Sequence, residues 1–226
     1  MLALNPARDD VDFLSLLSDV NRRRFLERST QDVYPAGAHV FHPGSPPKTF
    51  LIDRGLVRAY LTVPDGRQAT VGFRHSKELV GGTMTVSHPP RLLAHVVVES
   101  TLTTLDMETV RKLLSTEIEV LAAVATQLSA RLRNGTRLIA IRTLGNIRER
   151  LAYDLLERAT RSQLVGGRLD VSATHTELAD SIGSSREVVG RALSALRFEG
   201  IVETAPGLVW VSDPIRLASI VRDFDF

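Results

Sequence analysis

The chain has 226 residues, and its 28 basic and 26 acidic side chains give a formal net charge of only +2. This length allows one large domain or two ordinary ones, and we expect two. The absence of cysteine excludes disulfides, thiolate zinc sites, cysteine nucleophiles and cysteine-ligated iron-sulfur clusters. No apolar run approaches the ~20 residues of a membrane span, and the N-terminus lacks a basic leader, so we expect a cytoplasmic protein without a membrane anchor.

The region from about residue 33 to 105 alternates apolar and polar residues between turn signals. Arg54-Gly55 is one such signal, and Asp65-Gly66 is the strongest because both residues tolerate positive φ. Short strands at this spacing predict an α+β protein whose residues 1–105 form a β-roll of the jelly-roll type.

From Asp106 the apolar spacing changes from two to about three and a half, which predicts a long helix over residues 106–140. Its apolar stripe would consist of Leu114, Ile118, Leu121, Ala125, Leu128 and Leu132. Such a stripe predicts a homodimer formed through the helix; packing on the β-roll alone is the alternative. Gly135 and the LGN stretch at 144–146 are candidate breaks, so a hinge is expected near residues 140–147.

Residues 141–226 contain a helix, a short strand, two helices separated by Gly183 and two short strands around Ala205-Pro206-Gly207. This order predicts a winged helix-turn-helix, with Gly183 in the left-handed turn and Ser184 or Ser185 capping the second helix. The expected buried positions are Leu178, Ala179 and Ile182 on the first helix, and Val189, Leu193 and Leu196 on the second.

The opposite face of the second helix carries Arg186, Glu187, Gly190, Arg191 and Ser194. Arginine can donate two hydrogen bonds to guanine, and glutamate can accept one from cytosine, so this face has the chemistry to read G·C pairs. Two structural alternatives remain open at this point. Glu187 can form a capping box with Ser184, or it can pair with Arg191 on a solvated surface.

The stretch ELADSIGSSREVVGRALSAL followed by EGIVET resembles the Crp/Fnr superfamily of bacterial transcription regulators, and the resemblance extends from about residue 15 to 212. Ser185-Arg186-Glu187-x-x-Gly190-Arg191 matches the DNA-reading motif of its cyclic-AMP-receptor branch. The resemblance implies a cyclic-nucleotide-binding-like β-roll and TGTGA-like half-sites. It implies double-stranded DNA, a second copy of the chain and RNA polymerase as partners. By the same resemblance, Thr174 or Thr176 and the arginine-rich residues 131–150 would contact phosphates.

The effector cassette departs from the family pattern. Gly81-Gly82-Thr83 stands where cyclic-nucleotide binders have Gly-Glu-Leu, and Leu92-Leu93-Ala94 stands where they have Arg-Ser-Ala. Arg91 is one position away from the phosphate-binding arginine, and Thr136 occupies one of the positions that usually meet adenine. Cyclic AMP is therefore disfavoured, and the effector is unknown.

Several forms of regulation stay open. The effector can be a small molecule other than cyclic AMP. The alternatives are a regulator that is active without a ligand and a regulator that responds to a cyclic nucleotide or to haem. His39, His42, His75, His88 and His95 lie in the β-roll region but show no metal-ligand spacing, so no metal site is predicted.

Two other classes of protein fit the sequence less well than a DNA-binding regulator does. An enzyme is not expected, because paired carboxylates, nucleophile motifs, a P-loop and a dinucleotide fingerprint are all missing from the sequence. A ligand-binding module that uses its helix-turn-helix to contact protein is disfavoured by the polar residues at 186, 187 and 191.

Overall fold

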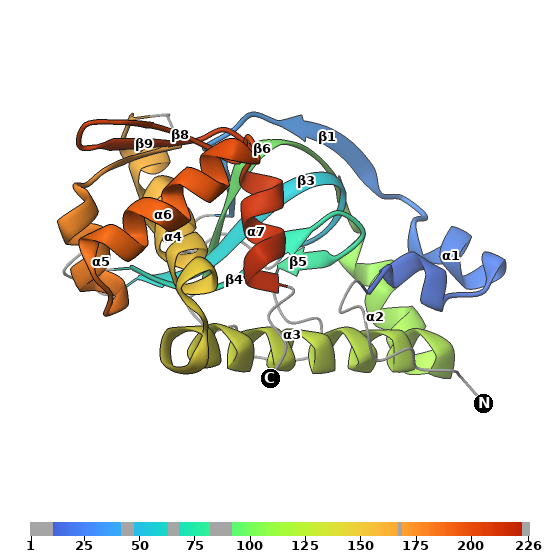
Figure 1. The fold of residues 1–226 in the computed structure, drawn as a ribbon. Coiled ribbons are helices and arrows are strands. Elements are labelled where there is room, and N and C mark those ends of the chain that lie inside the picture. Colours follow the sequence, from blue (N-terminus) through green and yellow to red (C-terminus); the bar gives the residue numbers. More distant parts are fainter. Residues whose placement is uncertain (1–10, 42–47, 63–67, 82–91, 167–168, 223–226) are drawn as a thin grey trace. The chain divides into compact units, whose positions relative to one another are not determined.

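A computed structural model of the chain describes residues 11–41, 48–62, 68–81, 92–166 and 169–222 (Figure 1). The chain forms two compact units, Met1–Arg133 and Asn134–Phe226, and helix α3 contributes to both. The first unit contains η1 (Phe13–Leu16), α1 (Asp19–Phe25), β1 (Thr30–Tyr34), β2 (His39–Phe41), β3 (Thr49–Thr62), β4 (Gln68–His75), β5 (Leu79–Gly81), β6 (Leu92–Thr104), α2 (Met107–Thr116) and most of α3 (Ile118–Leu144). The second contains the end of α3, α4 (Ile147–Gly166), β7 (Asp170–Ser172), α5 (His175–Ile182), α6 (Arg186–Phe198), β8 (Val202–Ala205), β9 (Leu208–Val211) and α7 (Pro214–Arg222).

The first unit is built on an antiparallel sheet in which β1, β6, β3 and β4 are neighbours in that order, while β2 pairs with β6 and β5 with β3. Its two long strands, β3 and β6, pair over most of their length with three register shifts. The predicted turn at Arg54-Gly55 is instead a bulge inside β3. Gly55 has φ 118°, and a Cβ at this position would lie 1.9 Å from Ser100 Oγ, so only glycine fits.

Two apolar clusters hold the first unit together. Val57, Ala94 and Val96 belong to a cluster formed by the sheet strands. Phe13, Phe25 and further residues of α1, α2 and α3 form a second cluster against β3 and β5. The predicted β-roll architecture is confirmed, and the Asp65-Gly66 hairpin turn lies outside the described residues.

The long helix differs from the prediction in where it begins. Helix α2 ends at Thr116 and α3 begins at Ile118, and the two axes are bent by 106°. Leu114 therefore lies on α2, where it packs against the core of the first unit, and it is not part of a single helical stripe. No single described helix is long and apolar enough to cross a membrane, and α2 and α3 pass that test only together, across this bend.

The helix continues through Gly135 and breaks at the predicted LGN stretch. A Cβ at Gly145 would lie 2.5 Å from the Ile141 carbonyl oxygen, so glycine allows the chain to turn closely against the helix end. Asn146 then caps α4, because Glu149 N donates to Asn146 Oδ1 at 3.1 Å and Asn146 N donates to Glu149 Oε2 at 2.8 Å.

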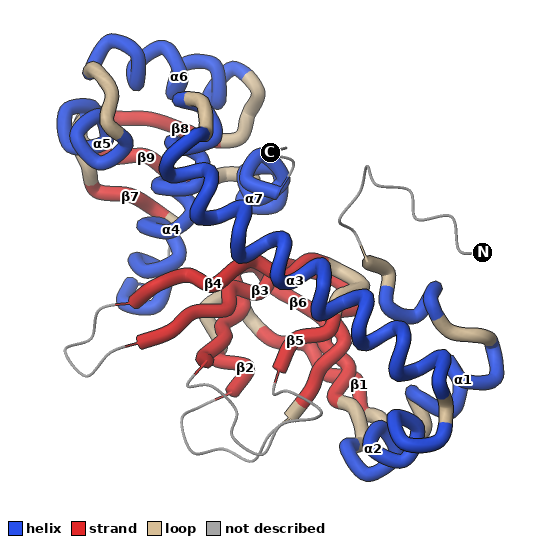
Figure 2. Tube along the Cα trace, turned by 90° about the horizontal axis from the view of Figure 1, so that it is seen from below, coloured by secondary structure: helices blue, strands red, loops and turns tan. Residues whose placement is uncertain are grey.

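In the second unit, α5 and α6 are followed by a β8–β9 hairpin, and β7 completes a three-stranded antiparallel sheet in the order β7, β9, β8 (Figure 2). The predicted winged helix-turn-helix is confirmed. Helix α7, which the sequence reasoning did not predict, packs against α4 through a buried face that includes Leu217 and Val221.

Candidate nucleic-acid interface

The turn between α5 and α6 is fixed at both helix ends. Gly183 ends α5 in the left-handed conformation, with φ 62° and ψ 55°, as its position in the sequence predicted. Arg150 of α4 donates from Nη1 to the carbonyl oxygen of Ile182 at 2.7 Å, which satisfies a backbone group left open at this helix end. The angle between α5 and α6 is therefore determined by local geometry within the second unit.

Helix α6 begins at Ser185, whose hydroxyl accepts a hydrogen bond from Val188 N at 3.4 Å. The predicted capping box of Ser184 with Glu187 does not form, because Ser185 is the N-cap. Val189, Leu193 and Leu196 are buried, as predicted. Burial of this apolar face directs the opposite face of α6 towards solvent.

That outer face presents Arg186, Glu187, Arg191 and Ser194, all of which are exposed. The ion pairs formed by the described residues do not include Arg186 or Arg191, so the alternative of a Glu187–Arg191 ion pair is not realised. Hydrogen bonds from its own backbone N–H and from the Ser185 hydroxyl hold the pKa of Glu187 below its usual value. Attraction to Arg186 and Arg191 lowers the pKa of Glu187 further. The helix therefore presents two exposed guanidinium groups beside an ionised carboxylate.

Gly190 has a different environment from the other residues of the motif. It is partly buried, and a Cβ at this position would lie 3.6 Å from His175 Nδ1 of α5. Sequence reasoning placed Gly190 on the outer face. The structure shows that a side chain at this position would point at α5, so the small residue lies at the crossing of the two helices.

Thr174 and Thr176 lie at the start of α5. Thr174 is the N-cap and forms a capping box with Glu177, whose carboxylate accepts from Thr174 N at 2.7 Å. Its hydroxyl is hydrogen-bonded within this box. Thr176 is exposed on the first turn of α5. The phosphate-contact prediction therefore rests more on Thr176 than on Thr174.

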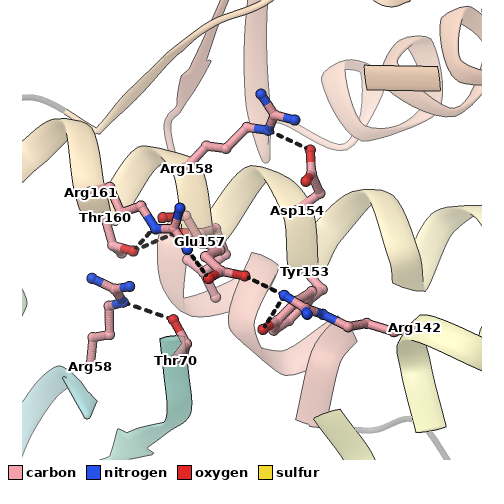
Figure 3. Close-up of polar contacts among 10 residues, drawn as sticks. Arg58, Thr70, Arg142, Tyr153, Asp154, Glu157, Arg158, Thr160 and Arg161 are labelled. Atoms are coloured by element: carbon pink, nitrogen blue, oxygen red, sulfur yellow. Dashed lines mark hydrogen bonds and ion pairs between the residues drawn. The ribbon is translucent and has the colours of Figure 1, made fainter. Parts of the chain in front are cut away.

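The arginines near the α3–α4 break make intramolecular contacts that the sequence did not predict. Arg148 forms a two-pronged pair with Glu199, at 2.5 and 2.7 Å. Arg142 of α3 donates to Glu157 of α4 at 3.0 Å and lies over the Tyr153 ring, while Arg161 also binds Glu157 (Figure 3). These arginines position helices, and their charge is offset by carboxylates.

Of the residues predicted for the effector site, the structure places Gly81 at the end of β5, Leu92 and Leu93 at the start of β6, and Thr136 on α3 in the second unit. Leu92 and Leu93 are both partly exposed. Gly82, Thr83 and Arg91 lie outside the described residues, as do His42 and His88. Within the described ranges, no group of three or more His, Asp or Glu side chains is arranged to hold a metal ion.

An apolar stripe runs along the solvent side of α3. Its exposed residues, which we call the α3 stripe, are Ile118, Leu121, Ala125, Leu128 and Leu132. Ile118 is 85% exposed and Leu132 is 74% exposed. Large apolar side chains exposed at this regular spacing are typical of a surface that another helix covers.

Comparison with known proteins agrees with the fold and with the helix-turn-helix geometry. Residues 31–117 match the family model of a cyclic nucleotide-binding domain, and residues 149–220 match that of a Crp-like helix-turn-helix domain. Together with the geometry of α5 and α6, these matches define a DNA-binding transcription regulator with a cyclic-nucleotide-binding-type sensor domain.

Relatives among characterised proteins identify the family. The cyclic AMP receptor protein of Thermus thermophilus is 31% identical over 190 residues, which cover 83% of this chain and 86% of the relative. The CRP-like protein Clp of Xanthomonas euvesicatoria is 29% identical over 191 residues, covering 79% and 82%. The chain belongs to the Crp/Fnr family of transcription regulators. The solved structure of the c-di-GMP-responsive global regulator CLP of Xanthomonas campestris shares the fold, with a TM-score of 0.54, 24% identity and coverage of 86% of this chain and 99% of that one.

Proposed function

We propose that this regulator reads a palindrome with TGTGA-like half-sites, using Arg186, Glu187 and Arg191 of α6 as base readers. The observation that carries the proposal is that these three side chains are exposed on one helix face and form no ion pair with one another. In this proposal Arg186 and Arg191 each donate two hydrogen bonds to a guanine, and Glu187 accepts one from cytosine N4. Ser185 and Gly190 support the reading helix, and Thr176 and Thr174 contact the DNA backbone near it.

The active species is a homodimer formed through the α3 stripe. The five exposed residues step by three and four along one helix, so a second copy of α3 covers them in a coiled-coil arrangement. A two-fold dimer presents two copies of α6 to successive major grooves, which matches a palindromic operator.

Regulation is proposed to involve a small molecule other than cyclic AMP. The similar proteins include a cyclic AMP receptor protein and a c-di-GMP-responsive global regulator. By resemblance, this chain lacks the ribose-binding carboxylate at Gly82 and the phosphate-binding arginine at Leu92. The protein acts in the cytoplasm with RNA polymerase as partner, and it has no enzymatic activity.

A gel-shift titration tests this function. The purified chain is mixed with a duplex that contains two inverted TGTGA half-sites, and with a control duplex of equal length and composition in which both half-sites are scrambled. We expect specific binding at least 1,000-fold tighter than binding to the control. Equal binding to the two duplexes, or no shift at low salt, rejects the proposal.

A further inference from the structure

His175 is the only histidine in the sequence of the second unit, and it lies beside the helix that carries the proposed base readers. It is the first residue of α5 and is partly exposed. A Cβ at Gly190 of α6 would lie 3.6 Å from Nδ1 of His175 and 3.9 Å from Cε1, so this edge of the ring faces Gly190. The glycine therefore leaves room for the imidazole where α5 and α6 cross.

The ring of His175 lies next to the half of α6 that carries the readers. Arg186 and Glu187 precede Gly190 by four and three residues, so they are its neighbours on the helix surface, and Arg191 follows it directly. The ring forms no hydrogen bond or ion pair with any of the described residues. Its nitrogens are therefore open at the surface that DNA covers in the proposed function.

The charge of this surface changes at His175 when the pH falls from 8 to 6. Histidine is the side chain that ordinarily gains a proton in this range, whereas arginine stays protonated throughout it. Hydrogen bonds from the Thr174 backbone N–H and hydroxyl, and then attraction to Arg158 of α4, hold the pKa of Glu177 below its usual value. The pKa of Glu187 is also held low. Both carboxylates therefore stay ionised while the imidazole titrates.

We propose that His175 is a further DNA-contacting residue, and that it binds an operator phosphate as the imidazolium ion. This step rests on the proposed function, in which α6 enters the major groove. Both nitrogens of the imidazolium donate hydrogen bonds, and a charged donor forms a short, strong hydrogen bond with a phosphate oxygen. A phosphate at this distance in turn favours the protonated ring. Proton binding and DNA binding therefore strengthen each other.

The sign of the pH dependence follows from this coupling. As the pH falls from 8 to 6, more chains carry the imidazolium and DNA affinity rises; as the pH rises again, the contact is lost. Because a phosphate contact carries no sequence information, the affinities for operator and for unrelated DNA should rise by the same factor. The regulator then responds to acidification through its DNA-binding unit, without a ligand in the sensor unit.

Fluorescence anisotropy at pH 6 and pH 8 tests the proposal, with the TGTGA duplex and its scrambled control over a range of sodium chloride concentrations. For the wild type we expect the dissociation constant to be about tenfold lower at pH 6. The plot of log affinity against log salt should be steeper at pH 6 by about 2, one phosphate for each His175 of the dimer. His175→Gln should bind at both pH values as the wild type does at pH 8. His175→Arg should bind tightly at both.

Asp154→Asn is the matched control. Asp154 of α4 bonds to Ser181 at the other end of α5, and burial raises its pKa, so it is a neighbouring carboxyl that can also change its charge. This variant should keep the pH dependence of the wild type. A pH dependence that survives in His175→Gln, or one that disappears in Asp154→Asn, overturns the inference. A salt dependence that is equally steep at pH 6 and pH 8 overturns it as well.

Melting temperatures separate loss of binding from loss of folding. Because the ring makes no hydrogen bond with the described residues, His175→Gln should melt at the wild-type temperature. If it does not, His175→Arg decides, since a pH dependence that persists in this variant overturns the inference. A wild type that discriminates between the duplexes but binds each equally at pH 6 and pH 8 keeps the proposed function and loses only this contact. One that binds both duplexes alike, with a pH dependence that His175→Gln removes, does the reverse.

Discussion

Individual side chains of α6 decide which DNA sequence the protein recognises. Arg191→Ala removes one bidentate base contact, so we expect it to cost about 1–3 kcal/mol of operator binding and to relax the preference at one base pair per half-site. The measurement is fluorescence anisotropy with a set of operators that carry single base changes. Arg197→Ala, in the exposed last turn of α6, is the matched control and should leave the preference unchanged. Equal weakening on every operator would instead assign Arg191 to a phosphate.

His95 makes the stability of the sensor unit depend on pH. It is fully buried beside Tyr60, and its two ring nitrogens have no hydrogen-bond partner among the described residues. Burial, followed by repulsion from Arg58 and His39, lowers the pKa of His95 to about 3. The folded protein therefore keeps this ring neutral at a pH where the unfolded chain already binds a proton.

The sign of the effect follows from this difference. Above pH 6.5 His95 is neutral in both the folded and the unfolded chain, so it does not change stability with pH. Below pH 6.5 the His95 ring binds a proton when the chain unfolds. The free energy of unfolding should fall by up to about 1.4 kcal/mol per pH unit between pH 6.5 and 3 because of this residue. Urea unfolding followed by circular dichroism at pH 7, 6 and 5 measures it. His95→Phe should have a shallower slope than the wild type, and identical slopes would contradict the assignment.

A small charge cluster joins the end of helix α3 to helix α4 within the second unit. Glu157 is buried and binds both Arg142 and Arg161 (Figure 3). Glu157→Gln preserves the size of the side chain but removes the negative charge that pairs with both arginines. We therefore expect the free energy of unfolding to fall by about 2 kcal/mol. Arg142→Ala should cost about 1 kcal/mol, since Glu157 keeps Arg161.

The fluorescence of Trp210, the single tryptophan, reports on unfolding of this unit because it lies on β9. A double-mutant cycle between Arg142→Ala and Glu157→Gln should give a coupling of about 0.5–1 kcal/mol. Strictly additive effects would show that the two side chains do not interact in solution.

At the scale of elements, the sequence predicted those parts whose signals are local. The winged helix-turn-helix was predictable because Gly183, Ser185 and the turn around Pro206 each act within a few residues. The bend at Glu117 was not, since Leu114 and Ile118 keep helical spacing across it. Gly55 is a similar case, because glycine is favoured both in turns and in β-bulges. Only the close approach of Ser100 of β6 shows that Gly55 forms a bulge.

Contacts between distant segments were the least predictable from sequence. Gln127 and Arg131 continue the helical spacing of Val120 and Val124, so they lie on the inward face of α3. Nothing in the sequence indicates that Arg74, more than fifty residues earlier, lies close to Arg131. Two polar residues at the buried spacing of α3, Gln127 and Arg131, were the available signal. Only the fold shows that Arg74 is their neighbour.

At the scale of the whole molecule, dimerisation and DNA recognition should depend on each other if the protein acts as a dimer. A substitution that disrupts the α3 stripe should then also weaken operator binding by α6. Leu121→Glu places a charge in the centre of the stripe, so we expect sedimentation to show a monomer and operator affinity to fall at least 100-fold, since each half-site is then bound alone. Thr126→Glu adds the same charge to α3 between the stripe and the buried face, and it is the matched control. A Leu121→Glu dimer that sediments like the wild type would refute the stripe as the interface. A monomer that still binds the palindrome at wild-type affinity would instead show that one copy of α6 suffices for recognition.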